Sequence, residues 1–252
     1  MYMIGPWRKR KQEPTQEELY LRGGIIQPFL RIFQDSKIVR KPVRWETVDG
    51  RTRRKSLLVQ WALLPKSSRT ESLSTDKRLQ YAESLCALYS KFDRPGFLMT
   101  LRSDLLITPE GSLLLDPVPS LSLYDMGGQN TSTMTLPHQT FWYQLMHIGQ
   151  IDCLGDVHLF GLGIQLYEIL EGHKPYDFEN KEVARQATRW LHTALRTQGR
   201  GEDFLPLPEP AVISEDVFQV LRKMLVISPE TNFESDEQAI EEIQAALQAE
   251  SG

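Results

Sequence analysis

The chain has 252 residues, of which 40% are hydrophobic and 25% are charged, a composition typical of one large globular domain or two small ones. These values exclude a disordered chain and a collagen-like fibre, and the two cysteines, Cys86 and Cys153, are too few for a disulfide scaffold or for a zinc site built on cysteine alone. The net charge of −4 is unevenly distributed, because residues 1–60 carry 14 Lys/Arg against 6 Asp/Glu whereas residues 61–252 carry 15 against 27, an asymmetry that favours an anionic partner.

Residues 1–18 are polar, and we expect them to form a flexible tail. The basic run at 8–11 follows Trp7 and has no apolar segment after it, an order that does not fit a secretory signal. No apolar run in the chain approaches the ~18 residues of a membrane-spanning helix. The sequence therefore predicts a cytoplasmic protein without a membrane span. We interpret the basic run as a solvated tail, with a contact to nucleic acid or an anionic surface as the alternative.

Residues 19–64 have the pattern of a small β-rich region. Three apolar pairs between residues 25 and 33 favour short strands. Asp49 and Gly50 together predict the turn of a hairpin, and the apolar run at 57–63 supplies its second strand.

A polar loop at 65–76 leads into a helix that begins at Thr75 or Asp76, since either residue can cap it. The apolar residues of this helix recur at intervals of three and four, which places them on one face. Cys86 belongs to that face, so we assign it to the core and not to a nucleophilic site.

Two short strands follow at 104–107 and 112–116. Between them, Pro109 and Gly111 occupy the second and fourth positions of a predicted type I turn. Residues 117–155 contain no clear element, and loops of that length are usually functional or mobile.

The second half of the chain has a helical pattern. Residues 156–170 are apolar nearly all round, which predicts a central, buried helix. Gly172 and Pro175 end it, in the order that helix termini prefer. Further helices are expected at 179–198, 214–226 and 235–248.

The segment 156–176 (DVHLFGLGIQLYEILEGHKPY) resembles the buried helix in the large lobe of eukaryotic-type Ser/Thr protein kinases. Weaker matches extend the resemblance over residues 57–248. In that family the position of Asp156 caps the helix and ties the catalytic loop, and the position of Gly161 allows close packing. The resemblance marks Asp156 and Gly161 as structural motif residues.

This resemblance implies an α+β, protein kinase-like fold with three regions. Residues 1–18 are the tail, residues 19–64 form a reduced β-rich N-lobe, and residues 65–252 form a mainly α-helical C-lobe. The first 60 residues are too few for a full small lobe, because the first third of them is polar tail.

Several groups that kinases use for phosphoryl transfer are absent from the sequence. No G-x-G-x-x-G loop occurs, and no V-A-I-K-like strand precedes a helix that bears a glutamate. Candidates for the lysine that kinases use in phosphoryl transfer are Lys37, Lys41 and Lys55, which are distinguished by charge alone. Where the family has His-Arg-Asp, this chain has apolar residues and a threonine, and neither Met99 nor Thr100 has the carboxylate that accepts a substrate proton. We therefore assign no catalytic residue.

Two carboxylates are candidates for metal binding. Asp104 falls where the resemblance places the metal-binding Asn, and Asp116 falls at the metal-binding Asp, with Pro117 and Val118 in place of Phe-Gly. Two neighbouring carboxylates can hold a divalent cation. The alternative is that Asp116 is a strand-end acid and Asp104 a turn acid without a ligand.

These features favour a catalytically degenerate protein kinase-like protein, a pseudokinase, that acts as a protein-binding, scaffolding or regulatory module. No cofactor is expected, and the partner would be a protein, with acidic character matching the basic N-terminal region. One alternative is an atypical Ser/Thr kinase that uses ATP and Mg²⁺ through Asp104 and Asp116. A second alternative is a nucleic-acid-associated protein that binds through the basic residues of 1–60.

Overall fold

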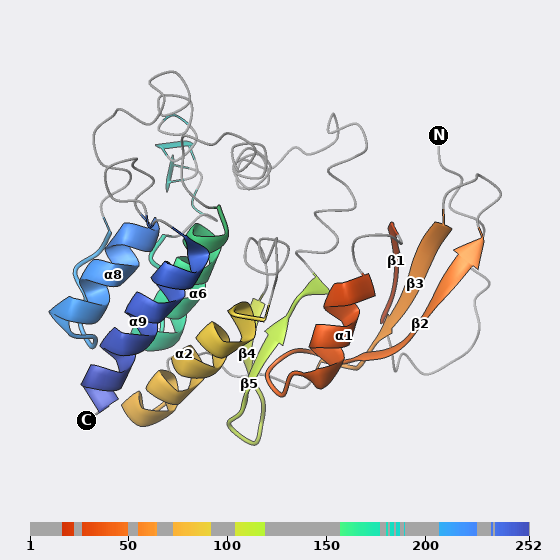
Figure 1. Cartoon of the computed structure of the whole chain (residues 1–252), viewed down its shortest axis with the longest axis horizontal. Helices are drawn as coiled ribbons and strands as arrows, with labels where there is room; N and C mark the ends of the chain where they lie inside the picture. Colours follow the sequence, from red (N-terminus) through yellow and green to blue (C-terminus); the bar gives the residue numbers. More distant parts are fainter. Residues whose placement is uncertain are drawn as a thin grey trace.

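The computed structural model describes residues 17–22, 27–49, 55–64, 73–91, 104–118, 157–176, 180, 182–183, 185–186, 189, 207–225, 233 and 235–251. These residues form an α+β structure in which a three-stranded sheet and a two-stranded hairpin adjoin a group of helices (Figure 1). The elements in chain order are β1 (Glu17–Arg22), α1 (Gln27–Asp35), β2 (Pro42–Asp49), β3 (Lys55–Trp61), α2 (Thr75–Tyr89), β4 (Asp104–Ile107), β5 (Leu113–Asp116), α6 (Val157–Glu171), α8 (Glu215–Leu225) and α9 (Asp236–Ser251).

The small sheet consists of β1, β3 and β2 in that order, with both neighbouring pairs antiparallel. The hairpin predicted around Asp49 and Gly50 is confirmed in its strands, because β2 and β3 pair from Asp49 opposite Lys55 to Pro42 opposite Trp61. The connecting residues 50–54 lie outside the described part of the chain. β1 begins at Glu17 and covers the other edge of β3.

Residues 27–35 form the helix α1, and the prediction of short strands there is wrong. Phe29, Leu30 and Phe33 are buried, and their spacing places them on one face of a helix. The error has a physical cause: apolar pairs that recur every three or four residues fit one helical face as well as they fit short strands. Phe33 packs against Trp61 of β3 with ring centroids 6.3 Å apart, so α1 covers the small sheet.

β4 and β5 form the antiparallel hairpin predicted for this region. The N–H of Gly111 donates to the carbonyl of Thr108 at 2.8 Å, which closes the connecting turn. Gly111 has φ +77°, a conformation that a residue with a side chain rarely adopts. Tyr81 of α2 donates its hydroxyl to the Gly111 carbonyl at 2.7 Å, so the turn is fastened to the helical part of the molecule.

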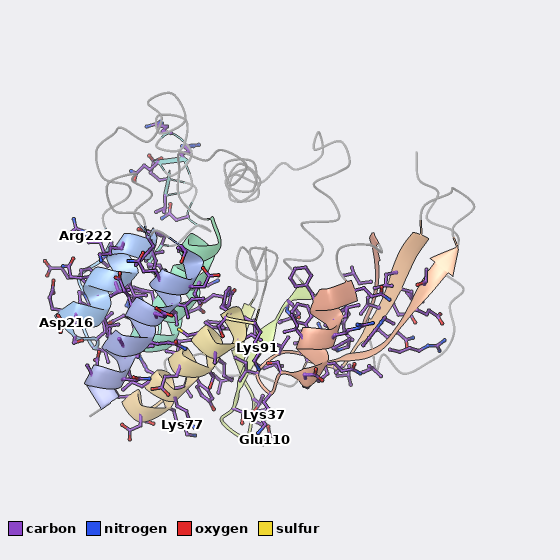
Figure 2. All side chains as sticks on the ribbon, viewed as in Figure 1. Lys37, Lys77, Lys91, Glu110, Asp216 and Arg222 are labelled. Carbon is purple, nitrogen blue, oxygen red and sulfur yellow. The ribbon has the colours of Figure 1, made fainter. Side chains whose placement is uncertain are left out.

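The helical part is built around α6, as its apolar sequence predicted. Helix α6 packs against α8 and α2, and α9 packs against the same two helices (Figure 1). The buried apolar side chains of α6 include Leu159, Leu162, Ile164, Leu166, Tyr167, Ile169 and Leu170. Gly172 ends the helix with φ +85°, and its N–H donates to the Glu168 carbonyl at 3.0 Å, which confirms the predicted stop. Polar residues such as Lys77, Asp216 and Arg222 project outward from the helices (Figure 2).

The predicted helices at 214–226 and 235–248 correspond to α8 and α9. Most of the helix expected at 179–198 lies outside the described residues. Among the residues that the structure does describe, no helix is long and apolar enough to span a membrane.

Candidate functional site

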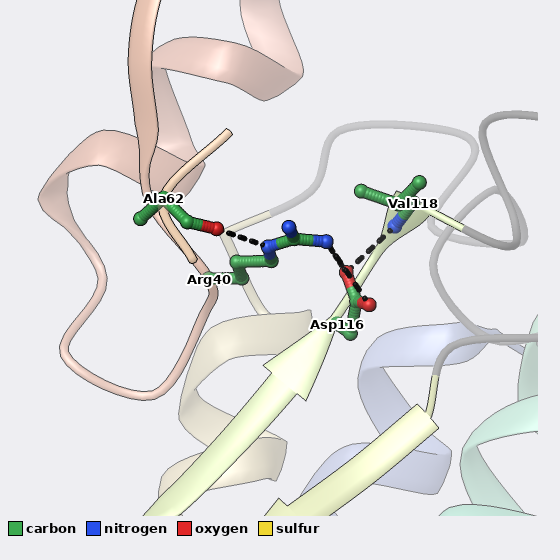
Figure 3. A network of polar contacts seen from close by, with 4 residues as sticks. All are labelled: Arg40, Ala62, Asp116 and Val118. Atoms are coloured by element: carbon green, nitrogen blue, oxygen red, sulfur yellow. Dashed lines mark hydrogen bonds and ion pairs between the residues drawn. The ribbon is translucent and has the colours of Figure 1, made fainter. Parts of the chain in front are cut away.

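The candidate site lies where the small sheet meets the hairpin, and its centre is an ion pair between Arg40 and Asp116 (Figure 3). A guanidinium nitrogen of Arg40 donates to Oδ1 and Oδ2 of Asp116, each at 3.3 Å. The two side chains are only 3% and 6% exposed. Removing opposite charges from water is costly unless each finds a partner, so the two residues depend on one another.

Two backbone groups extend the network around this pair. Arg40 Nε donates to the carbonyl of Ala62, just past the end of β3, at 2.7 Å. The N–H of Val118 donates to Oδ1 of Asp116 at 3.2 Å. The network therefore links the exit of the small sheet to the segment that follows the hairpin, as Figure 3 shows.

The backbone fixes the position of both side chains. Val39 forms a parallel bridge with Leu115 of β5. The N–H of Leu115 donates to the Ile38 carbonyl at 2.6 Å, and the N–H of Arg40 donates to the Leu115 carbonyl at 2.8 Å. Because Arg40 and Asp116 each adjoin this bridge in sequence, their side chains start from neighbouring backbone positions. The contact is thus built into the chain path and does not depend on a long side-chain reach.

The strand register places the two predicted metal ligands next to one another, since Asp104 pairs directly opposite Asp116. The carboxylate of Asp116 is engaged by a buried cation, which the sequence did not indicate. Among the described residues, no group of three or more His, Cys, Asp or Glu side chains is arranged to hold a metal ion. A metal site at Asp104 and Asp116 stays a prediction.

Of the lysines considered for a nucleotide, Lys41 has a clear structural role. Its ammonium donates to the Gln34 carbonyl at 2.6 Å and also to the Ser36 carbonyl, at the C-terminal end of α1. A cation at this end of a helix is stabilised by the helix dipole. Lys37 is exposed, and Asp35, the single carboxylate within α1, is exposed as well.

Of the two structural motif residues that the resemblance marks, the structure describes Gly161 and not Asp156. Gly161 is buried within α6, whereas Asp156 lies outside the described residues. The close helix approach occurs at Gly163, where an added Cβ would lie 3.1 Å from atoms of Leu225 and Met224 in α8. Met99 and Thr100, at the expected catalytic loop, also lie outside the described part of the chain.

Comparison with known proteins bears on the fold. No protein-family model matches the chain, and no curated protein matches it. Among solved structures, the Cydia pomonella granulovirus kinase PK-1 is similar over 94% of this chain and 87% of that chain, with a TM-score of 0.51 and 12% sequence identity. The fold is kinase-like. At this identity the likeness concerns architecture alone. It confirms the kinase-like α+β fold that the segment 156–176 implied.

Proposed function

We propose that this protein is a non-catalytic, kinase-fold binding module, a pseudokinase that acts through a protein partner. The observation that carries the proposal is the ion pair between Arg40 and Asp116. Phosphoryl transfer in kinases needs a metal ion on an Asp at this junction, because the metal neutralises the charge that develops on the phosphate. Here the corresponding carboxylate is neutralised by a side chain of the same protein.

Electrostatics argue against a metal ion at Asp116 while Arg40 stays in place. Two cations that share one buried carboxylate repel one another, and the repulsion is strongest where water is excluded. The Val118 N–H also occupies part of Oδ1. A divalent ion would therefore have to displace the guanidinium from a site in which it is 3% exposed.

The sequence supports the same conclusion from other positions. A catalytic kinase needs a Lys–Glu pair between a strand of the small sheet and the following helix. The helix α1 has no Glu, and its one acid, Asp35, is exposed. Met99 and Thr100 replace the catalytic acid, and the phosphate-covering glycine loop is missing from the sequence.

We propose that the partner is an acidic protein that binds the basic N-terminal region. In that region Arg31, Lys37 and Arg44 are exposed, and Arg44 is partly neutralised by Glu46 at 2.5 Å. A basic surface of this kind increases the rate of association with an anionic partner. The first 16 residues add four further basic side chains and one acid, a balance that strengthens the same preference.

A phosphate-transfer assay tests the non-catalytic part of the proposal. The full chain is incubated with radiolabelled ATP, Mg²⁺ or Mn²⁺, and general protein substrates. We expect the same background incorporation from the wild-type chain and from Asp116→Asn. Incorporation by the wild type that disappears in Asp116→Asn would instead support an atypical kinase.

Isolation of the tagged full chain from its native cell tests the partner. The matched control is a chain with the four basic residues at 8–11 changed to alanine. We expect an acidic protein whose recovery falls in the control and is unchanged by nuclease treatment. Recovery that depends on nucleic acid would contradict the proposal and favour the nucleic-acid alternative.

A further inference from the structure

The environment of Arg40 differs from that of an ordinary surface arginine. Its Nε contacts the Ala62 carbonyl at 2.7 Å, and its terminal nitrogen contacts both oxygens of Asp116. Its backbone N–H is bonded to Leu115 of β5. One residue thus touches the end of the small sheet, the hairpin and the carboxylate at the hairpin's end.

We propose that Arg40 is an internal cation that fills the place beside Asp116 and thereby joins the small sheet to the hairpin without metal or nucleotide. The guanidinium is well suited to this position, because it stays charged under all ordinary conditions and its planar shape presents several N–H donors at fixed angles. In Arg40 the Nε–H donates to the Ala62 carbonyl and a terminal N–H donates to the Asp116 carboxylate, so two donors pointing in different directions are used at once. A lysine ammonium has no planar fork and cannot reproduce both contacts with the same geometry.

This arrangement has a consequence for regulation. In a kinase-like fold whose parts are joined through a bound metal and nucleotide, the arrangement of the small sheet depends on ligand concentration. In this chain the linking group is the side chain of Arg40, which is part of the protein and therefore always present. The surfaces on either side of the junction are therefore held in one arrangement whether or not ATP and Mg²⁺ are available. The inference concerns how the parts are joined and does not rest on the binding role proposed above.

Chemical rescue tests whether the site beside Asp116 is a cation site. Arg40→Ala removes the guanidinium, and millimolar methylguanidinium chloride then supplies a free one. We expect the melting temperature of Arg40→Ala to fall and to recover with methylguanidinium, but not with the same concentration of sodium chloride. Arg44→Ala, which removes an exposed arginine, and the double variant Arg40→Ala/Asp116→Asn should show no recovery. Absence of rescue in Arg40→Ala, or equal rescue in the double variant, would overturn the proposal.

Amide hydrogen exchange provides a second measurement, which does not need Arg40→Ala to fold. In Arg40→Lys, which keeps the charge, we expect the backbone amides of Leu115 and of residue 40 to exchange at least about tenfold faster than in the wild type. The Leu221 amide in α8 should exchange at the same rate in both proteins. Equal exchange at Leu115 in the two proteins would contradict the joining role. In the wild-type chain, ATP with Mg²⁺ should leave Leu115 exchange unaltered, and added protection there would contradict independence from nucleotide.

Discussion

The carboxylate of Glu171, the last residue of α6, accepts a hydrogen bond from the backbone N–H of Val212 at 3.0 Å. The neighbouring N–H groups of Ala211 and Ile213 donate to the same carboxylate at 3.0 and 3.1 Å. Glu171 is buried, so three consecutive backbone donors ahead of α8 depend on one side chain. The contact ties the end of the central helix to the segment that leads into α8.

Replacement of Glu171 should therefore destabilise the fold more than replacement of a surface glutamate. Glu171→Ala leaves three backbone donors without this acceptor, and we expect a loss of about 3 kcal/mol in the free energy of unfolding. Glu171→Gln keeps one acceptor oxygen, so its free energy of unfolding should lie between those of the wild type and Glu171→Ala. Glu182→Ala is the control, because that side chain is exposed and its ion pair with Arg185 is 3.4 Å long. Urea unfolding measures all three, and equal midpoints for Glu171→Ala and Glu182→Ala would contradict the assignment.

The close approach of α6 and α8 predicts a second effect. An alanine at Gly163 would place its Cβ 3.1 Å from Leu225 and Met224. Helix propensity alone favours alanine over glycine by about 1 kcal/mol. Overpacking of the contact should outweigh this gain, and we expect Gly163→Ala to be destabilised by about 1–2 kcal/mol. An increase in the melting temperature of Gly163→Ala would show that the helices separate more easily than the structure implies.

The buried thiol of Cys86 predicts a dependence of stability on pH. Burial raises the pKa of this thiol to about 12, and the nearby Glu83 carboxylate adds to the increase. In the unfolded chain a cysteine ionises near pH ~8.5, so above that pH the unfolded state loses a proton that the folded state keeps. Stability should then fall with rising pH between about 9 and 12, by up to about 1.4 kcal/mol per unit from this residue. Below pH ~8 the thiol stays protonated in both states, so it does not change the pH dependence of stability.

Unfolding measured from pH 7 to 10 in the wild type and in Cys86→Ala isolates this contribution from that of other groups. The alanine variant should be less stable at pH 7, because it leaves a cavity, but it should lose less stability as the pH rises. Curves that stay parallel up to pH 10 would contradict the buried position of the thiol.

Much of the helical part was predictable from hydrophobic periodicity. The helix at 75–89 has its apolar residues on one face, and the run at 156–170 is apolar nearly all round, so each pattern specified both an element and its degree of burial. The sequence pattern of α1 also fits short strands, because the helix is short and its described buried side chains are Phe29, Leu30 and Phe33. A pattern of that length does not distinguish the two periods.

The centre of the candidate site was only half predictable. The kinase resemblance marks the position of Asp116. Arg40 was one of many basic residues in the N-terminal region, and it lies 76 residues before Asp116 in the sequence. Their meeting depends on the parallel bridge between Val39 and Leu115, a tertiary contact that no local pattern encodes.

Coupling between the two residues can be measured with a double-mutant cycle. Arg40→Met or Asp116→Asn alone leaves one buried charge without its partner, and we expect each to cost about 3–5 kcal/mol. The double variant should cost less than the sum, with a coupling energy of about 2 kcal/mol. The matched control is the pair of Arg44 and Glu46, which are 64% and 45% exposed and should couple by less than about 0.5 kcal/mol. Equal coupling in the two cycles would mean that burial does not strengthen the inner pair.

The most direct test of the account is the binding of nucleotide and metal to the full chain, measured by titration calorimetry. Because Arg40 neutralises Asp116, we predict no saturable heat when ATP is added with Mg²⁺ or with Mn²⁺. Asp116→Asn should give the same flat titration. Saturable, metal-dependent binding of ATP to the wild type that is lost in Asp116→Asn would contradict the account, because it would show that Asp116 serves a metal ion in spite of Arg40.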